Sequence, residues 1–265
     1  MKTSFPMQKI VTALPAQLLA INARQKLWLP AITLAATCVF TSTTAAAMED
    51  SMLLTGVNVD QLEWRDTDEG DVAAWDAQVW LGDDLNKLIL NSEGEYRHGD
   101  NRHNNEHDSA TEEAELQLLY SRAITAYWNF QAGWRGDLQP TPERHWLALG
   151  LEGLAPWFID VNATLFVGNE DRTALRLGLE HELMLTQRLA LVPEIELNVY
   201  GRNDPETATG AGLSDVTAGM RLHYEITREF APYVGVHYWK QYGNTARFSR
   251  EDDEKTDGAE FVAGI

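Results

Sequence analysis

Residues 174–200 are two alternating runs that meet at a short polar turn. In each run, one set of alternate residues is almost purely aliphatic, and the other set carries ionised or amide side chains. A period of two is typical of a β-strand, because successive side chains point to opposite faces. The aliphatic set is Leu175, Leu177, Leu179, Leu183, Leu189, Leu191, Ile195, Leu197 and Val199, and the polar set is Arg176, Glu180, Glu182, Glu194, Glu196 and Asn198. The segment is therefore predicted to be a β-hairpin with one apolar and one charged face.

The charged face limits where such a hairpin can lie. A packed core cannot take a row of ionised side chains without a large desolvation cost. A soluble sandwich would turn the charges to water, whereas a membrane barrel would turn the aliphatic face to lipid and the charges to a polar lumen. Each run is about as long as a tilted strand that crosses a bilayer. The hairpin alone fits both arrangements.

The same alternation recurs along the rest of the chain. Strands are expected near residues 52–65, 75–81, 87–97, 113–121, 128–135, 146–154, 159–165, 174–183, 189–200, 215–225, 233–239 and 261–265. That makes about twelve strands, an even number, as in single-chain outer-membrane barrels. The connections after even-numbered strands are short, and those after odd-numbered strands tend to be longer and richer in charge. We therefore predict an all-β fold, a transmembrane antiparallel up-and-down β-barrel.

The N-terminus has the order of a secretory signal. Basic residues at positions 2, 9, 24 and 26 come first, an apolar run covers residues 27–40, and alanines at 45–47 follow. This run is too short for a spanning helix but suits a cleaved signal peptide. We expect a signal peptide over residues 1–47, a barrel over residues 48–265, and an outer-membrane location in a Gram-negative bacterium. Because the last strand ends without a terminal aromatic residue, we expect it to be truncated in this sequence.

Charge and cysteine content restrict the partners. Cys38 is the single cysteine and lies in the signal segment, so the exported part has no disulfide. All 40 acidic residues lie after Ala47, together with fewer than the 21 basic residues of the whole sequence. Such a chain repels nucleic acid and attracts cations. No apolar run after the signal is long enough for a spanning helix, so insertion into lipid must use strands.

Alternation directs many ionised side chains into the lumen of the predicted barrel. The acidic ones are Glu93, Glu95, Glu113, Glu115, Asp160, Glu180, Glu182, Glu194, Glu196, Asp215 and Glu225, and the basic ones are Arg135, Arg176 and Arg221. One interpretation is a cation-attracting interior, since carboxylates can replace part of a cation's hydration shell. The other is that these charges pair with one another and plug the barrel. Both interpretations stay open.

Two groups of histidines are candidate metal ligands. His98, His103 and His107 share one long hydrophilic loop, and imidazole suits divalent copper. The alternative is a soluble loop in which these histidines are incidental. His223 and His237 are expected on neighbouring strands, both pointing inward, with Glu225 beside the first. They are either copper ligands or members of a polar hydrogen-bond network.

Several segments resemble one known family, the copper resistance protein B family. They are ELQLLYSRAI, LMLTQRLALVPEIELN, GLSDVTAGMRLHYEITREFAPYVGV and FVAGI, in the family's order and within residues 53–265. The resemblance implies an outer-membrane barrel that works in copper tolerance beside periplasmic copper proteins. The family's methionine- and histidine-rich stretch before the barrel is not matched here. Between Ala47 and the first strand, Met48 and Met52 are the only residues of these two types.

The resulting hypothesis is an outer-membrane barrel for copper binding or export in copper resistance, with copper ions bound and not used in catalysis. Its expected partners are membrane lipid, copper ions and a periplasmic copper protein. One alternative is a general cation or small-solute channel without copper specificity, and another is a structural barrel that docks periplasmic copper proteins. No motif for a nucleophile or a Ser/His pairing is visible in the alternation, so we expect no enzyme.

Overall fold

The computed structural model describes residues 53–67, 70–98, 109–227, 230–251 and 253–265. The expected signal peptide and residues His103 and His107 lie outside the described residues. The strands are β1 Leu54–Thr67, β2 Gly70–Gly82, β3 Asn86–His98, β4 Ser109–Ala123, β5 Trp128–Gln139, β6 Arg144–Ala155, β7 Ile159–Gly168, β8 Thr173–His181, β9 Leu183–Met184, β10 Leu189–Tyr200, β11 Gly212–Tyr224, β12 Tyr233–Gln241 and β13 Asp257–Gly264. Two short helices, η2 Pro205–Thr207 and α2 Thr245–Glu251, lie in the connections.

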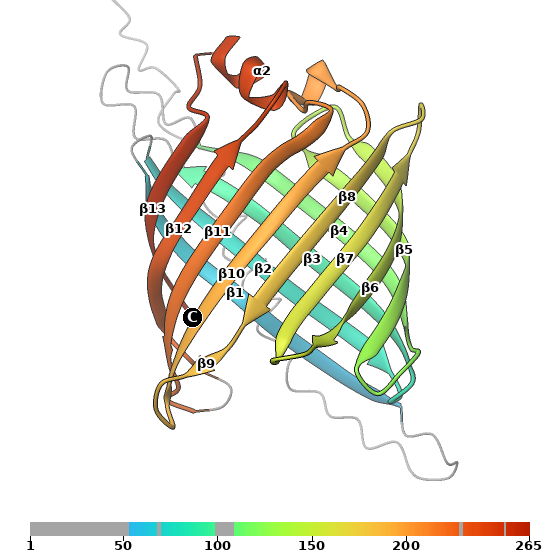
Figure 1. The fold of residues 1–265 in the computed structure, drawn as a ribbon, viewed down its shortest axis with the longest axis vertical. Helices are drawn as coiled ribbons and strands as arrows, with labels where there is room; N and C mark the ends of the chain where they lie inside the picture. Colours follow the sequence, from blue (N-terminus) through green and yellow to red (C-terminus); the bar gives the residue numbers. More distant parts are fainter. Residues whose placement is uncertain (1–52, 68–69, 99–108, 228–229, 252) are drawn as a thin grey trace, which may run out of the picture. The chain divides into compact units, whose positions relative to one another are not determined.

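The strands form one closed antiparallel barrel (Figure 1). Each strand pairs with its neighbours along the chain, and β1 closes the sheet against β13, from Glu63 opposite Gly264 to Asp66 opposite Phe261. The two-residue β9 continues β8, and both pair with β10. The barrel therefore has 12 strand positions, which confirms the predicted fold.

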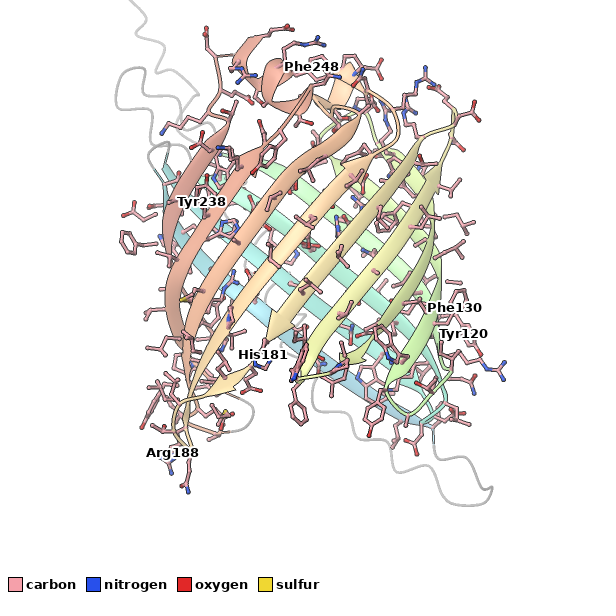
Figure 2. All side chains as sticks on the ribbon, viewed as in Figure 1. Tyr120, Phe130, His181, Arg188, Tyr238 and Phe248 are labelled. Atoms are coloured by element: carbon pink, nitrogen blue, oxygen red, sulfur yellow. The ribbon has the colours of Figure 1, made fainter. Side chains whose placement is uncertain are left out.

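The outer face of the barrel is apolar. Large side chains at alternate positions of neighbouring strands are exposed, among them Leu62, Trp64, Val79, Leu81, Leu118, Leu147, Leu165, Leu175, Val234 and Val236. Exposed aromatic residues accompany them on the outside, and Figure 2 labels Tyr120, Phe130 and Tyr238. Exposed apolar and aromatic side chains on every side suit contact with lipid.

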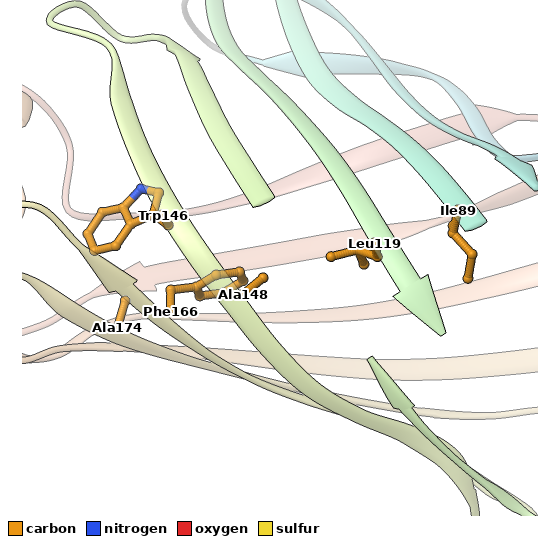
Figure 3. Packing of buried hydrophobic residues seen from close by; sticks show 6 residues of the cluster. All are labelled: Ile89, Leu119, Trp146, Ala148, Phe166 and Ala174. Atoms are coloured by element: carbon orange, nitrogen blue, oxygen red, sulfur yellow. The ribbon is translucent and has the colours of Figure 1, made fainter. Parts of the chain in front are cut away.

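A smaller apolar cluster faces inward, which the alternation did not lead us to expect. It consists of Ile89, Leu119, Trp146, Ala148, Phe166 and Ala174 (Figure 3). The indole Nε1 of Trp146 donates to Asp137 Oδ2 at 2.8 Å, and the Arg135 guanidinium lies 4.4 Å from the centre of the Phe166 ring. The lumen wall is thus partly apolar and still holds charged groups.

The two ends of the barrel have different connections. Residues 83–85, 124–127, 156–158, 185–188 and 225–232 join strands at what we call the short-turn end; the opposite end is the long-loop end. Three of the short turns begin with side-chain caps: Asp83 Oδ1, Thr125 Oγ1 and Thr186 Oγ1 each accept backbone N–H groups two and three residues later. Such caps are typical of Asx and Ser/Thr turns.

The long-loop end differs in part from the expectation. Asp66 pairs with Asp71 and Thr67 with Gly70, so β1 and β2 extend beyond the expected strands over residues 52–65 and 75–81. The last connection contains the helix α2, which the alternation did not predict, and the Thr245 hydroxyl of this helix accepts a hydrogen bond from the Gly210 N–H at 2.8 Å. None of the helices among the described residues has the length and apolarity needed to cross a membrane.

Candidate functional site

The inward faces of the strands surround a cavity of about 1820 Å³. Carboxylates outnumber arginines and lysines among its lining residues. Its acidic lining residues are Asp60, Asp66, Asp76, Glu93, Glu95, Glu113, Glu115, Asp137, Glu152, Asp160, Glu180, Glu194, Glu196, Asp204, Glu206, Asp215, Glu254, Asp257 and Glu260. Most of the predicted lumen carboxylates are in this set, together with Arg135, Arg176 and Arg221.

Strand register places many of these carboxylates in rows. One row crosses four neighbouring strands, because Asp76 lies opposite Glu93, Glu93 opposite Glu115, and Glu115 opposite Asp137. Like charges directly opposite each other are destabilising, so such a row needs cationic partners.

A second row lies on the other side of the barrel. Asp160 on β7 is opposite Glu180 on β8, which is opposite Glu194 on β10. The row continues across Gly219 of β11 to His237 of β12 and Glu260 of β13. Five consecutive strand pairings therefore connect carboxylates and one imidazole at a similar level of the wall.

Arg176 and Arg135 neutralise part of the first row. Arg176 Nη2 lies 2.9 Å from Glu115 Oε2, and its guanidinium also lies 3.5 Å from carboxylate oxygens of Glu93 and Glu196. Arg135 Nη2 lies 2.8 Å from Glu115 Oε2, and Arg135 Nε lies 2.7 Å from Asp137 Oδ1. Glu115 is thus held by two arginines from two different strands.

A second network is built around Glu63, which is buried on β1. Arg65 Nε donates to Glu63 Oε1 at 2.7 Å, and Arg221 Nε donates to Glu63 Oε2 at 2.8 Å. Arg65 also contacts Glu95, and Arg221 also contacts Glu194. Sequence reasoning missed Glu63 and Arg65, although both alternate with the outward-facing Leu62 and Trp64. The register shift between Val59 and Gln61 disturbs the alternation earlier in β1 and hides the signal.

Other lumen carboxylates make no ion pair among the described residues. They are Asp60, Asp76, Glu113, Asp160 and Glu180, and they line the same cavity. Arginines therefore bind some carboxylates across the lumen, and other carboxylates line the cavity without an ion pair. The pairing interpretation describes part of this interior, and the cation-attracting interpretation stays a prediction.

At the long-loop end, Asp204 ties loop and barrel together. Arg144 binds its carboxylate through two hydrogen bonds of 2.9 and 3.1 Å, and Arg172 Nε lies 3.1 Å from Asp204 Oδ2. Burial raises the pKa of Asp204, but the hydrogen bonds and charge of Arg144, with the charge of Arg172, outweigh it and lower that pKa overall.

The two predicted lumen histidines do not meet. His223 lies opposite Tyr233 and His237 opposite Gly219, so four residues of an antiparallel pair, about 13 Å, separate them. The His223 ring stacks on Tyr233 at 4.7 Å and does not line the cavity. His237 is buried and lines the cavity, with Nδ1 3.7 Å from Glu260 Oε2; Trp239 Nε1 donates to the other oxygen of Glu260 at 3.0 Å.

The remaining predicted ligands are also dispersed. Glu225 follows the end of β11, its backbone N–H donates to Arg188 O at 2.8 Å, and it does not line the cavity. Glu182 interrupts the strand between β8 and β9 and is exposed outside the cavity lining. His98 is the last residue of β3, whereas His103 and His107 lie in the loop outside the described residues.

The structure does not bring His223, His237 and Glu225 into one coordination sphere. In the described part of the chain, no group of three or more histidine, cysteine, aspartate or glutamate side chains is arranged to hold a metal ion. Among the described residues, His237 lies near one carboxylate at the lumen, that of Glu260, a residue that sequence reasoning did not single out. Its signal was available, because the last strand alternates Glu260 against Ala259 and Phe261.

A closed antiparallel barrel with an apolar exterior and a charged lumen is an outer-membrane-type β-barrel. The family model for the copper resistance protein B precursor matches residues 53–265. Over 227 residues the chain is 43% identical to a copper resistance protein B homolog of Pseudomonas syringae pv. tomato, covering 86% of this chain and 74% of that protein. Over 218 residues it is 40% identical to copper resistance protein B of Escherichia coli, covering 82% and 70%. The chain belongs to the copper resistance protein B family.

The crystal structure of the outer membrane protein OprD from Pseudomonas aeruginosa also resembles the fold. It covers 73% of this chain and 58% of its own, with 10% sequence identity and a TM-score of 0.33. This likeness is too distant to add to the classification.

Proposed function

We propose that this barrel binds copper ions in its lumen and lets them pass across the outer membrane in copper resistance, without catalysing a reaction. The observation that carries the proposal is the row Asp160–Glu180–Glu194 that leads across Gly219 to His237 and Glu260. Asp160 and Glu180 have no ion-pair partner in the described residues and line the cavity. Family membership supports copper as the cation, because the relatives are named for copper resistance.

The chemistry of the row suits a divalent ion in transit. Carboxylates exchange with water around a cation without holding it tightly, whereas neutral imidazole favours copper over alkaline-earth ions. His237 Nδ1 has no hydrogen-bond partner among the described residues and lies 3.7 Å from Glu260 Oε2. We propose that copper contacts His237 and Glu260. In this proposal His98, His103 and His107 form a separate group that collects copper.

A general cation channel is the second candidate. The observation that favours it is the absence, within the described ranges, of a preformed group of three metal-binding side chains. A barrel that only docks a periplasmic copper protein is the third, favoured by the Arg176–Glu115 contact that crosses the lumen. Measurements of copper binding, cation conduction and copper resistance distinguish the three candidate functions.

The test is a titration of the barrel in vesicles with Cu(II) and Zn(II), using His237→Ala, Glu260→Gln and the control His145→Ala. His145 is exposed, at the long-loop end of β6, and its ring lies 5.7 Å from that of Trp134. Copper binding that weakens in the first two variants and not in the control supports the lumen site. Binding that persists there and is lost on changing His98, His103 and His107 moves the site to the loop.

Equally weak binding of both metals together with cation conduction identifies a general channel instead. A docking barrel is identified if the wild-type protein conducts no cations and copper resistance is nevertheless lost without it.

A further inference from the structure

The connection between β6 and β7 carries two bulky aromatic residues in an unfavourable backbone conformation. Trp157 has φ 67° and Phe158 has φ 59°, both in the left-handed region. This region is disfavoured for residues with a Cβ and is a genuine outlier for bulky ones. Both side chains are also exposed, Trp157 to 82% and Phe158 to 75%. Neither the backbone conformation nor burial within the protein explains why aromatic residues occupy this turn.

The opposite end of β7 provides an internal comparison. Glu170 and Asp171, in the connection to β8, also have left-handed backbones with φ 59°. The same unusual conformation is therefore built from acidic residues at the long-loop end and from aromatic residues at the short-turn end. The difference must lie in what surrounds the two ends, because the backbone requirement is alike.

The neighbouring short turns share the apolar character. Leu85, Ile124, Tyr127, Leu185 and Ile226 are exposed, and none of them lines the cavity. Two of the turns also contact the ends of neighbouring strands: Leu154 N of β6 donates to Tyr127 O at 2.9 Å, and His181 Nδ1 of β8 lies 2.8 Å from Phe158 O. Figure 2 places His181 at the lower end of β8 in that view. The short turns therefore expose large apolar side chains, as the outer face of the barrel does.

We propose that Trp157 and Phe158 insert into the interfacial layer of the bilayer at the short-turn end and anchor the barrel at that depth. Tryptophan and tyrosine prefer this layer because their rings are amphipathic. Contact with lipid also removes the cost of exposing the apolar Phe158 ring to water. Insertion provides the stabilisation that maintains the left-handed backbone. The proposal requires only that the barrel lies in a bilayer, and it is independent of copper.

The test uses a substitution for which backbone strain and membrane insertion predict opposite signs. In Trp157→Asn with Phe158→Gly, the new residues accept the left-handed region with little strain, so the turn itself becomes more favourable. If the aromatic rings are anchored in lipid, the urea midpoint of the barrel in phosphatidylcholine vesicles nevertheless shifts to a lower concentration. The matched control, Glu170→Asn with Asp171→Gly, relieves the same strain at the other end and leaves the midpoint unchanged or raises it.

A second measurement locates the ring directly. Phosphatidylcholine brominated in its acyl chains near the headgroup should quench a component of tryptophan fluorescence that Trp157→Phe removes, and aqueous iodide should not quench that component. The proposal is overturned if the Asn-Gly variant is as stable as the wild type in vesicles. It is equally overturned if iodide quenches the Trp157 component, as it would for a ring left in water for a protein partner.

Discussion

Arg176 on β8 reaches Glu115 on β4 across the lumen, with Nη2 2.9 Å from Oε2, although β5, β6 and β7 separate the two strands in the sheet. Both side chains are largely buried, at 18% and 11% exposure. Glu115 also binds Arg135. The contact joins two separate parts of the wall, so part of the lumen charge supports the fold and is not free to bind solutes.

Removing the Arg176 charge is expected to destabilise the barrel. Arg176→Met keeps much of the side-chain volume but leaves Glu93, Glu115 and Glu196 without this shared partner. Breaking a buried ion pair from one side costs about 3 kcal/mol or more, because a charge stays buried without compensation. Urea unfolding in vesicles, followed by tryptophan fluorescence, measures the change.

Arg250→Met is the control for this prediction. Arg250 is exposed on α2, where a substitution changes stability by less than about 0.5 kcal/mol. Equal effects of the two variants would show that Arg176 has no special structural role. A combined Arg176→Met, Glu115→Gln variant should recover part of the loss, since it removes one of the uncompensated charges.

Cation selectivity should depend on Glu180 and not on its near neighbour Glu182. Glu180 lines the cavity between Asp160 and Glu194 in the register, whereas Glu182 lies outside the lining. Glu180→Gln should lower the ratio of cation to anion permeability by roughly a factor of two, because a fixed negative charge leaves the path. Reversal potentials across planar bilayers report the ratio, and an equal fall in Glu182→Gln would contradict the assignment.

The loop over residues 201–211 should loosen at acid pH. The pKa of Asp204 is lowered in the folded protein from its ordinary 3.8, so its contribution to stability is complete above that value and is lost as pH falls through the folded pKa. Asp204→Asn should raise the loop's hydrogen-exchange rate at neutral pH, by the equivalent of about 2 kcal/mol for the lost charged hydrogen bonds.

The difference between Asp204→Asn and the wild type should then shrink as the pH falls below 3.8, and it should disappear below the lowered pKa of the folded protein, where the wild-type carboxylate is also neutral. Asp171→Asn, at an exposed turn of the same end, is the control and should not change the exchange of this loop. A pH-independent difference would argue against the charge of Asp204 as the cause.

Two strand glycines should respond differently to replacement by alanine. A Cβ at Gly133 would lie 2.0 Å from the backbone oxygen of Leu118, so strand β4 or β5 would have to move, at a cost of about 1–3 kcal/mol. A Cβ at Gly178 would approach nothing closer than 3.8 Å. Gly178→Ala should therefore be neutral or stabilise by about 0.5 kcal/mol. Urea midpoints of the two variants test the contrast directly.

Local alternation was sufficient to predict which way most strand residues point. Glu93, Glu95, Glu180 and Glu194 line the cavity as expected, because side-chain direction has a period of two in any regular strand. The prediction was incomplete where the strand is irregular. The shift between Val59 and Gln61 obscured Glu63 and Arg65, and the interruption at Glu182 removed that residue from the lining.

The sequence by itself determined the closed antiparallel barrel, its apolar exterior, its acidic interior and, through resemblance of whole segments, its family. The barrel, its apolar exterior and its acidic interior follow from periodicity and composition, which are local. Only the tertiary structure decided which charges meet: strand register placed His237 beside Glu260 and four residues away from the position opposite His223, and the curvature of the closed sheet brought Arg176 to Glu115. Register and closure depend on all strands together, so partners across the lumen cannot be read from one strand at a time.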